Sequence, residues 1–193
     1  MRKILPVILG MSLAQAAYAD TYAIDKDHSQ VGFKIKHLAI STVPGTFSEF
    51  SGTFDFDPKN VAAAKVDATI AVSSVNTNQA KRDNHLRDAD FFDVSKFPEM
   101  KFVSKKVTPV DADSFKVVGE LTIRDVTKPV TLDVEFGGAA KDPWGNDRAA
   151  FTATTKFNRK DWGMQWNKAL ETGGLLVGED VHVTLEIEGI KKS

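Results

Sequence analysis

The sequence predicts an all-β fold, an antiparallel sheet of about eight strands with one apolar face. Apolar residues recur at every second position along most of the chain, which is the period of a strand with one buried face. Turn signals and two long connections separate these segments. The helices that alternate with strands in a parallel sheet are missing from the pattern, so we expect the strands to pair antiparallel.

The first expected strand, residues 31–37, shows the alternation most plainly. Val31 and Phe33 share one phase, Lys34 lies in the other, and His37 continues the apolar phase. A histidine on the inward phase must find a hydrogen-bond partner in the core or lie beside a polar group of a ligand. Both interpretations of His37 stay open at this point.

The second expected strand, residues 50–56, contains a change of phase just before it. Phe50 and Phe54 lie in one phase, whereas Phe47 is out of phase with them. One extra residue in a strand produces such a shift, and the usual structure is a β-bulge. We therefore expect a bulge near residues 48–51.

The remaining six strands follow in order, five of them with the same period of two. Their apolar-phase residues are Val66, Ala68, Ile70 and Val72; Phe115, Val117, Gly119, Leu121 and Ile123; Val130, Leu132, Val134 and Phe136; Phe151, Ala153, Thr155 and Phe157; and Val181, Val183, Leu185 and Ile187. A further strand is expected over residues 101–108. The turn signals between strands are Asp57-Pro58-Lys59-Asn60, Asp111-Ala112-Asp113, Gly137-Gly138 and Asp142-Pro143-Trp144-Gly145.

Two long connections interrupt the strand pattern, residues 76–98 and 159–178. The first has a polar stretch that predicts a short helix around residues 79–86, and the second contains Trp162 and Trp166. Connections of this length inside a compact domain usually have a function, such as capping a site. We therefore expect short helical segments in two capping loops.

Eight one-faced strands can close into a barrel or stack as a sandwich. Closure removes the exposed strand edges, and an eight-stranded barrel has room for side chains or for one small ligand. The apolar phase must face inward because the opposite phase carries charged residues such as Lys34 and Glu186, unlike the outer surface of an outer-membrane barrel. Strand parity does not distinguish a filled core from a ligand cavity.

The first nineteen residues have the three parts of a secretory signal peptide. Arg2 and Lys3 precede a mostly apolar run, and Ala17-Tyr18-Ala19 supplies small residues at the −3 and −1 positions. The run is short for a membrane span, and Pro6 interrupts it. We expect export, cleavage after Ala19, and one domain over residues 20–193.

Composition excludes several classes of function. The chain has 25 Lys and Arg against 26 Asp and Glu, so it lacks the positive charge that non-specific nucleic-acid binding requires. The absence of cysteine excludes disulfides, zinc–thiolate sites and thiol nucleophiles. Thirteen phenylalanines against three tryptophans and two tyrosines suit a dry interior, whether side chains or a ligand fill it.

Ordered sequence blocks resemble one family. The blocks are His28-Ser29-Gln30-Val31-Gly32-Phe33, Gly45-Thr46-Phe47, Phe50-Ser51-Gly52-Thr53-Phe54, Val75-Asn76-Thr77, Lys81-Arg82-Asp83-Asn84-His85-Leu86-Arg87, Asp90-Phe91-Phe92-Asp93-Val94, Gly119-Glu120-Leu121-Thr122-Ile123, Val126-Thr127-Lys128-Pro129-Val130-Thr131-Leu132, Asn158-Arg159-Lys160-Asp161-Trp162-Gly163 and Gly178-Glu179-Asp180-Val181. In this order they resemble the YceI family of bacterial periplasmic proteins. Two positions depart from the family pattern: Trp162 stands where phenylalanine is common, and Asp125 where glycine is frequent.

The resemblance implies an extended eight-stranded antiparallel β-barrel, lipocalin-like, with a central tunnel for long amphiphilic lipids, polyisoprenoids in particular. An isoprenoid quinone or a fatty-acid-like lipid fits the same description. The candidates for the tunnel lining are Val31, Phe33, His37, Phe47, Phe54, Phe102, Leu121, Leu132, Phe151, Trp166, Leu185 and Ile187. Taken singly, each of these residues is as well explained by ordinary core packing.

Four polar residues are candidates for the lipid headgroup: Arg82, Asp83, His85 and Arg148. Guanidinium groups match phosphate and carboxylate oxygens, so these residues could hold a headgroup at the mouth of the tunnel. The alternative is a structural network in which arginines and Asp83 satisfy one another and pin the long loop. Arg159 has the same two interpretations as Arg148.

The leading hypothesis is a periplasmic, non-catalytic carrier of a polyisoprenoid-type lipid, with no cofactor other than that ligand. The four histidines lack metal-ligand spacing, and the chain has no nucleophile elbow, P-loop or dinucleotide motif. An isoprenoid- or quinone-modifying enzyme with acid–base residues in the barrel mouth is the alternative, and a protein-interaction module ranks last. A homodimer is compatible with this architecture.

Overall fold

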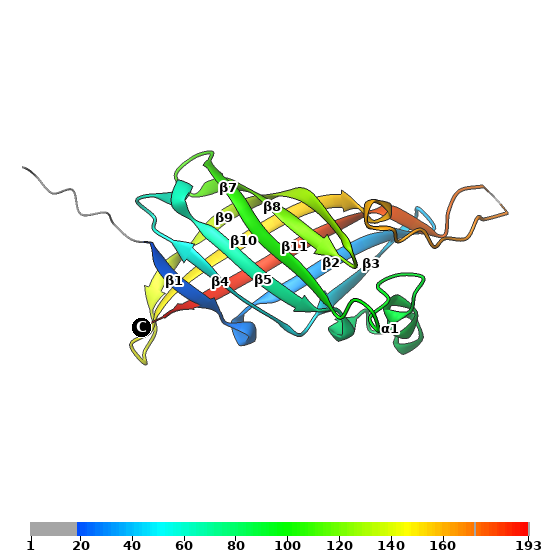
Figure 1. Ribbon diagram of the computed structural model, residues 1–193, viewed down its shortest axis with the longest axis horizontal. Helices are drawn as coiled ribbons and strands as arrows, with labels where there is room; N and C mark the ends of the chain where they lie inside the picture. The colour runs from blue at the N-terminus through cyan, green and yellow to red at the C-terminus, as the bar shows by residue number, and fades with distance from the viewer. Residues whose placement is uncertain (1–18, 172, 193) are drawn as a thin grey trace, which may run out of the picture.

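Strands with one apolar face curl around that face until the sheet closes, and the result here is an antiparallel barrel (Figure 1). The computed structural model describes residues 19–171 and 173–192. The expected signal peptide therefore lies outside the described residues, apart from Ala19. In the described part, no helix is long and apolar enough to cross a membrane.

The barrel is built from the following elements. The strands are β1 (Asp20–Ile24), β2 (Gln30–His37), β3 (Ser41–Phe47), β4 (Phe50–Phe56), β5 (Lys65–Ala71), β6 (Val75–Asn76), β7 (Glu99–Pro109), β8 (Ser114–Ile123), β9 (Val126–Lys141), β10 (Asp147–Asn158) and β11 (Val177–Lys191), and the α-helix is α1 (Ala80–Arg87). Short 3-10 helices cover Lys26–His28, Val61–Ala63, Val72–Ser74 and Arg159–Trp162.

β11 closes the sheet into a barrel, because it pairs with β10 along one edge and with β1 and β2 along the other. The strand order is β1-β4-β5-β7-β8-β9-β10-β11-β2-β3-β6, and β11 also pairs with β1. β1 and β2 both pair with β11, so they act as one strand interrupted by the 3-10 helix Lys26–His28. β3 pairs with β2 and β4 pairs with β1, so these two also form one interrupted strand. The predicted closed eight-stranded antiparallel barrel is confirmed.

The interruption between β3 and β4 lies where we expected a bulge. Ser48 and Glu49 leave the ladder and bond elsewhere: the Ser48 N–H donates to the Ser74 carbonyl (3.4 Å), and the Glu49 carbonyl accepts from Ala71 (2.8 Å). The phase change between Phe47 and Phe50 is therefore real, but a strand break produces it instead of a bulge. The expected strands also omit β1 and β3. Pro and Gly inside β3 weaken its strand signal.

A bulge does occur at a place where the sequence predicted a turn. β9 continues through Gly137 and Gly138, and the register with β10 shifts there, because Phe136 faces Phe151 while Gly138 faces Ala150. Gly138 has φ +127°, a backbone conformation that glycine adopts at little cost. The chain reverses later, between Lys141 and Asp147. The turn predicted at Gly137-Gly138 is therefore wrong.

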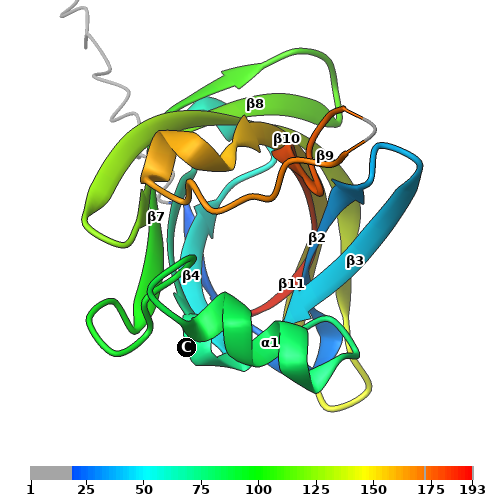
Figure 2. The ribbon, with the colours of Figure 1, turned by 90° about the vertical axis from the view of Figure 1, so that its right-hand side faces the viewer.

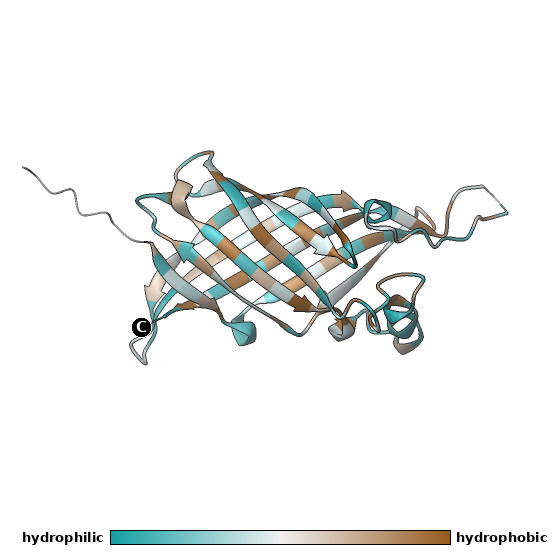
Figure 3. Cartoon of the chain, in the orientation of Figure 1, coloured by the Kyte–Doolittle hydropathy of each residue, from teal (hydrophilic) through white to brown (hydrophobic). Residues whose placement is uncertain are grey.

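The two long connections lie at the same end of the barrel, which we call the mouth. Figure 2 looks along the barrel from this end and shows α1 and the segment after β10 on opposite sides of its rim. The expected short helix around residues 79–86 is confirmed as α1, whose N-cap Gln79 accepts from the Arg82 N–H (2.8 Å). Hydrophilic and hydrophobic residues alternate along the strands (Figure 3). The opposite end, near the β9–β10 turn, is the floor.

Candidate functional site

A cavity of about 570 Å³ runs inside the barrel. Every barrel strand from β1 to β11 contributes to its wall, and only the two-residue β6 does not. Pockets that bind one small molecule have volumes of about 300–1,000 Å³, so the space suits a single ligand. The barrel interior is therefore hollow, a point on which strand parity gave no answer.

All twelve positions expected to line a tunnel lie on the wall of this cavity. They are Val31, Phe33, His37, Phe47, Phe54, Phe102, Leu121, Leu132, Phe151, Trp166, Leu185 and Ile187. Further wall residues, such as Val130 and Val183, belong to the same apolar phases and could have been named from the period alone. Phe91 and Phe92 follow α1, where no strand period applies, so the sequence pattern does not predict them as lining residues. That a ligand contacts any of these residues stays a prediction.

A cluster of phenylalanine rings lies at the floor end of the barrel. The rings of Phe54, Phe56, Phe115, Phe136 and Phe151 lie 4.9–6.3 Å apart, centroid to centroid. Most of these contacts are tilted or edge-to-face, the geometry that aromatic pairs prefer. A molecule inside the cavity therefore meets an apolar wall at its inner end.

Aromatic and basic side chains surround the mouth. His85 on α1 packs edge-to-face on Phe91 (5.1 Å) and on Trp166 (4.7 Å), and all three line the cavity. The Nε2 atom of His85 lies 2.7 Å from Asp90 Oδ2. These contacts join the two long connections across the mouth.

The expected headgroup residues on α1 separate into two kinds. Arg82 lines the cavity while its Nε donates to Thr77 Oγ1 (2.7 Å) and its Nη2 to the Thr77 carbonyl (2.8 Å). Asp83 is buried and does not line the cavity, because its carboxylate accepts from the Thr77 N–H (2.8 Å) and hydroxyl. Thr77 thus links Arg82 to Asp83, which agrees with the alternative that these residues form a structural network. Arg82 and His85 face the cavity as well.

Arg148 lies at the floor end, far from the mouth. Its Nε donates to Asp142 Oδ2 (2.8 Å), and its Nη1 donates to Asp25 Oδ2 (2.7 Å) and to Glu188. It is not a wall residue of the cavity. β10 places Arg148 and Arg159 at opposite ends of the barrel, so one headgroup cannot contact both.

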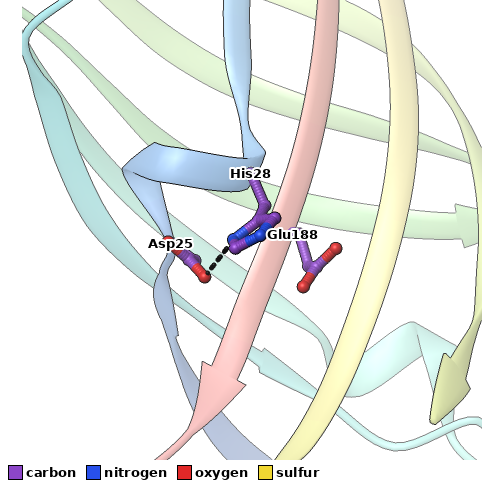
Figure 4. Close-up of side chains that lie close together, drawn as sticks. All are labelled: Asp25, His28 and Glu188. Atoms are coloured by element: carbon purple, nitrogen blue, oxygen red, sulfur yellow. Dashed lines mark hydrogen bonds and ion pairs between the residues drawn. The ribbon is translucent and has the colours of Figure 1, made fainter. Parts of the chain in front are cut away.

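The cluster formed by Arg148 and its three carboxylates also places a histidine beside two of them. Figure 4 shows these residues, Asp25, His28 and Glu188. Their nearest ligand atoms lie within 4.8 Å of one another, and His28 Nδ1 is 2.8 Å from Asp25 Oδ2. The guanidinium of Arg148 already binds both carboxylates. The Arg148 guanidinium therefore occupies the position beside these carboxylates that a metal ion would take.

Ionisation in this cluster reflects the same contacts. Burial acts to raise the pKa of Asp142, but hydrogen bonds from Asn146 and Arg148 outweigh it and hold that pKa well below its usual range. The pKa of Asp25 is lowered too, since the bonds from Arg148 and His28 overcome its burial. Hydrogen bonds to Asp142, Asp25 and Glu188 raise the pKa of Arg148. At neutral pH the cluster is therefore a charged structural tie.

Comparisons with known proteins agree with this architecture. A family model described as a YceI-like domain matches residues 22–189. The Protein YceI of Escherichia coli is 42% identical over 184 residues, which cover 94% of this chain and 93% of the relative. Among solved structures, a Campylobacter jejuni YceI protein is 40% identical with a TM-score of 0.70, covering 88% of this chain and 96% of that one.

A more distant structure has a similar fold. It is a polyisoprenoid binding domain from Saccharophagus degradans, described as implicated in plant cell wall breakdown. It is 16% identical, with a TM-score of 0.62, and the match covers 89% of this chain and 98% of that domain. At 16% identity, this similarity shows a shared fold.

Proposed function

Because this chain belongs to the YceI-like family, we propose that it is a binding protein that holds one long amphiphilic lipid, of the polyisoprenoid class, inside its barrel. The observation that carries the proposal is the hollow interior of about 570 Å³, walled by apolar side chains from all the barrel strands. The description of the Saccharophagus degradans domain as polyisoprenoid binding supports the class of ligand.

The energetics of the cavity favour an apolar chain. Burial of apolar surface contributes about 25 cal/mol per Å², so about 300 Å² of lipid surface would contribute about 7 kcal/mol before the cost of ordering the lipid. Water gains little in such a space, because a water molecule needs two to four polar partners. The phenylalanine floor offers none, so the tail would lie there.

The two ends of the cavity suit the two ends of an amphiphile. The phenylalanine cluster makes the floor end apolar, whereas the mouth carries Arg82, His85 and the indole of Trp166. A lipid that enters tail first keeps its polar head at the mouth. We take the protein to be a non-catalytic carrier, and turnover of a bound lipid would indicate the enzyme alternative.

Blocking the cavity tests the proposal. Leu185→Trp adds a large ring on the inward face of β11, whereas Thr184→Trp adds the same ring on the exposed outward face. Geranylgeraniol, a neutral C20 isoprenoid alcohol, serves as the probe in a fluorescence-displacement titration. Leu185→Trp should weaken its binding at least 10-fold, and Thr184→Trp should leave binding within 2-fold of the wild type. Thermal unfolding confirms that both variants fold.

Two results would overturn the proposal. One is a wild-type protein that takes up no isoprenoid and whose native mass spectrum, after purification from its own host, shows no bound lipid. The other is equal binding by both tryptophan variants, since the lipid would then lie outside the barrel. Incubation with the probe followed by mass analysis of the recovered lipid detects any turnover.

The proposed location is the periplasm, reached by export and cleavage after Ala19. The apolar amino-terminal segment with its Ala17-Tyr18-Ala19 site supports this. Amino-terminal sequencing of protein recovered from the periplasmic fraction should begin at Asp20. Recovery of the uncleaved chain in the cytoplasm would contradict the proposed location without affecting the ligand.

A further inference from the structure

Arg159 is a buried arginine at the mouth of an apolar cavity. It follows β10 directly and continues the inward phase of Phe151, Ala153, Thr155 and Phe157, so its side chain lines the cavity. Only 2% of the residue is exposed. Arginine is among the residues least often buried, and when buried it is normally paired with a carboxylate.

The guanidinium of Arg159 is only partly satisfied. Its Nε donates to the Gly178 carbonyl (3.0 Å) and its Nη1 to the Met164 carbonyl. Within the described residues, Nη2 is buried without a hydrogen-bond partner, and no carboxylate lies within ion-pair distance of the side chain. The guanidinium carbon lies 5.8 Å from the centroid of the Phe91 ring.

The acidic residue whose charge acts on Arg159 is already engaged. Glu179 accepts from Lys160 and from Asn158 Nδ2 (3.3 Å), so it acts on Arg159 only at longer range. Burial lowers the pKa of Arg159, and the charge of Glu179 opposes that effect in part. Arginine nevertheless keeps its proton at neutral pH. Among the described residues, a full positive charge therefore lies in the cavity wall without a carboxylate paired directly to it.

The other charged wall residues at the mouth have the same sign. They are Lys81 and Arg82, with His37 and His85 beside them, whereas Lys36 lies on the outward phase of β2. The acidic wall residue is Asp55, on β4 toward the floor, which accepts from Thr21 Oγ1 (2.6 Å). The carboxylates of Asp83 and Asp90, close to the mouth, are engaged by Thr77 and His85. The mouth thus presents cations to whatever enters it.

We propose that Arg159 anchors an anionic headgroup, a phosphate or carboxylate carried by the lipid, through the free N–H bonds of Nη2. The inference rests on the proposed lipid-binding function and specifies the class of lipid. An isolated buried charge is costly, and an anion that completes its hydrogen bonds removes that cost. The planar fork of arginine matches phosphate and carboxylate oxygens. The tail then extends toward the phenylalanine floor.

A matched pair of lipid probes separates the contribution of the headgroup to binding from that of the tail. Geranylgeranyl monophosphate and geranylgeraniol share the same chain and differ only in the phosphate. The wild type should bind the phosphate at least 10-fold more tightly, since hydrogen bonds to charged groups correspond to about 10- to 100-fold in affinity. Arg159→Gln should lose most of this preference while keeping the affinity for the alcohol within about 3-fold.

Arg124→Gln is the control. Arg124 packs against the same segment from outside the cavity: its Nη1 donates to the Gly163 carbonyl (3.3 Å), and its guanidinium carbon lies 5.6 Å from the centroid of the Phe97 ring. It does not line the cavity, so its variant should retain the full preference for phosphate. If Arg159→Gln fails to fold, Arg159→Lys keeps the charge without the fork and should show an intermediate preference.

The outcomes are distinct. A wild type that binds phosphate and alcohol equally would overturn the headgroup assignment and leave lipid binding intact. An Arg159→Gln variant that keeps the preference would also overturn it. A wild type that binds neither probe would instead contradict the proposed function. Inorganic phosphate alone must not compete at concentrations comparable to those of the lipid, because such competition would indicate a free-anion site.

Discussion

Two arginines at the ends of β10 show how burial and partners decide the role of a charged residue. Arg148 is bound by three carboxylates from the β9–β10 turn, the β1–β2 junction and β11. Arg159 donates only to two backbone carbonyls and has a nitrogen without a partner in the described chain. Arg148 is therefore a structural tie at the floor, and Arg159 is the residue available to a ligand.

Acid unfolding should report on the Arg148 cluster. The pKa values of Asp142 and Asp25 are lowered in the folded protein, so between the folded and unfolded values the unfolded state binds more protons. Their contribution to stability is present above pH ~4, the unfolded value, and is lost as pH falls toward the folded values. Arg148→Met should lower stability at pH 7 and flatten its decline between pH 5 and pH 2.

Urea unfolding at several pH values measures this effect. Lys156→Met serves as the control, because Lys156 forms an exposed ion pair with Asp180 (3.1 Å) of the kind that contributes little. The control should keep the acid dependence of the wild type. Parallel pH curves for Arg148→Met and the wild type would show that Arg148 does not hold these carboxylates ionised.

At the scale of strands, glycines make room for aromatic rings inside the barrel. A Cβ atom on Gly45 would lie 2.3 Å from the Phe33 ring, one on Gly119 equally close to the Phe102 ring, and one on Gly189 2.5 Å from Phe54. In the first two pairs the ring and the glycine lie on neighbouring strands, whereas β1 lies between Phe54 on β4 and Gly189 on β11. Glycine weakens a strand, and the packed ring compensates for that weakness.

Gly119→Ala should therefore be destabilising by about 1–3 kcal/mol, the range for overpacking a core. The new methyl group meets the Phe102 ring and, at 2.8 Å, the Val103 carbonyl, so the ring must move into the cavity. Gly137→Ala is the control, because its nearest contact is 3.4 Å and it has no positive φ. Chemical denaturation that finds the two variants equally stable would contradict this account.

The elements themselves were largely predictable. The strands with regular alternation were expected at nearly their observed positions, because a half-buried strand requires that period. β1 and β3 were not expected, because β1 has only five residues and β3 contains Pro44 and Gly45. The tertiary pairing with β11 and β2 holds these two segments extended. The positive φ of the β8–β9 turn falls on Arg124, one residue before Asp125.

At the scale of the whole molecule, a hollow barrel lacks part of the packing that a filled core supplies. A ligand that binds only the folded state therefore adds to its stability. With free lipid at about 100 times its dissociation constant the gain is about 2.7 kcal/mol. Delipidated protein should unfold at a lower temperature than protein saturated with geranylgeranyl phosphate, and adding the lipid back should restore the higher value.

Calorimetry of the delipidated, reloaded and Leu185→Trp proteins tests this linkage. The Trp variant has its cavity occupied by its own side chain, so added lipid should leave its unfolding temperature unchanged. Identical curves for the delipidated and reloaded wild type would mean that the ligand does not bind the folded barrel selectively.

The sequence alone determined which residues face inward, since the period of two assigns every strand residue to one face regardless of what lies opposite. It also placed both long connections, and it contained the blocks that relate the chain to its family. Whether the interior is hollow was decided only by the tertiary structure, because that depends on how far apart opposite walls stand. The tertiary structure also decided which groups form hydrogen bonds with Arg148 and Arg159. Asp25 and Glu188 lie 123 and 40 residues from Arg148, and only barrel closure brings them to it, while no carboxylate of the described chain pairs with Arg159.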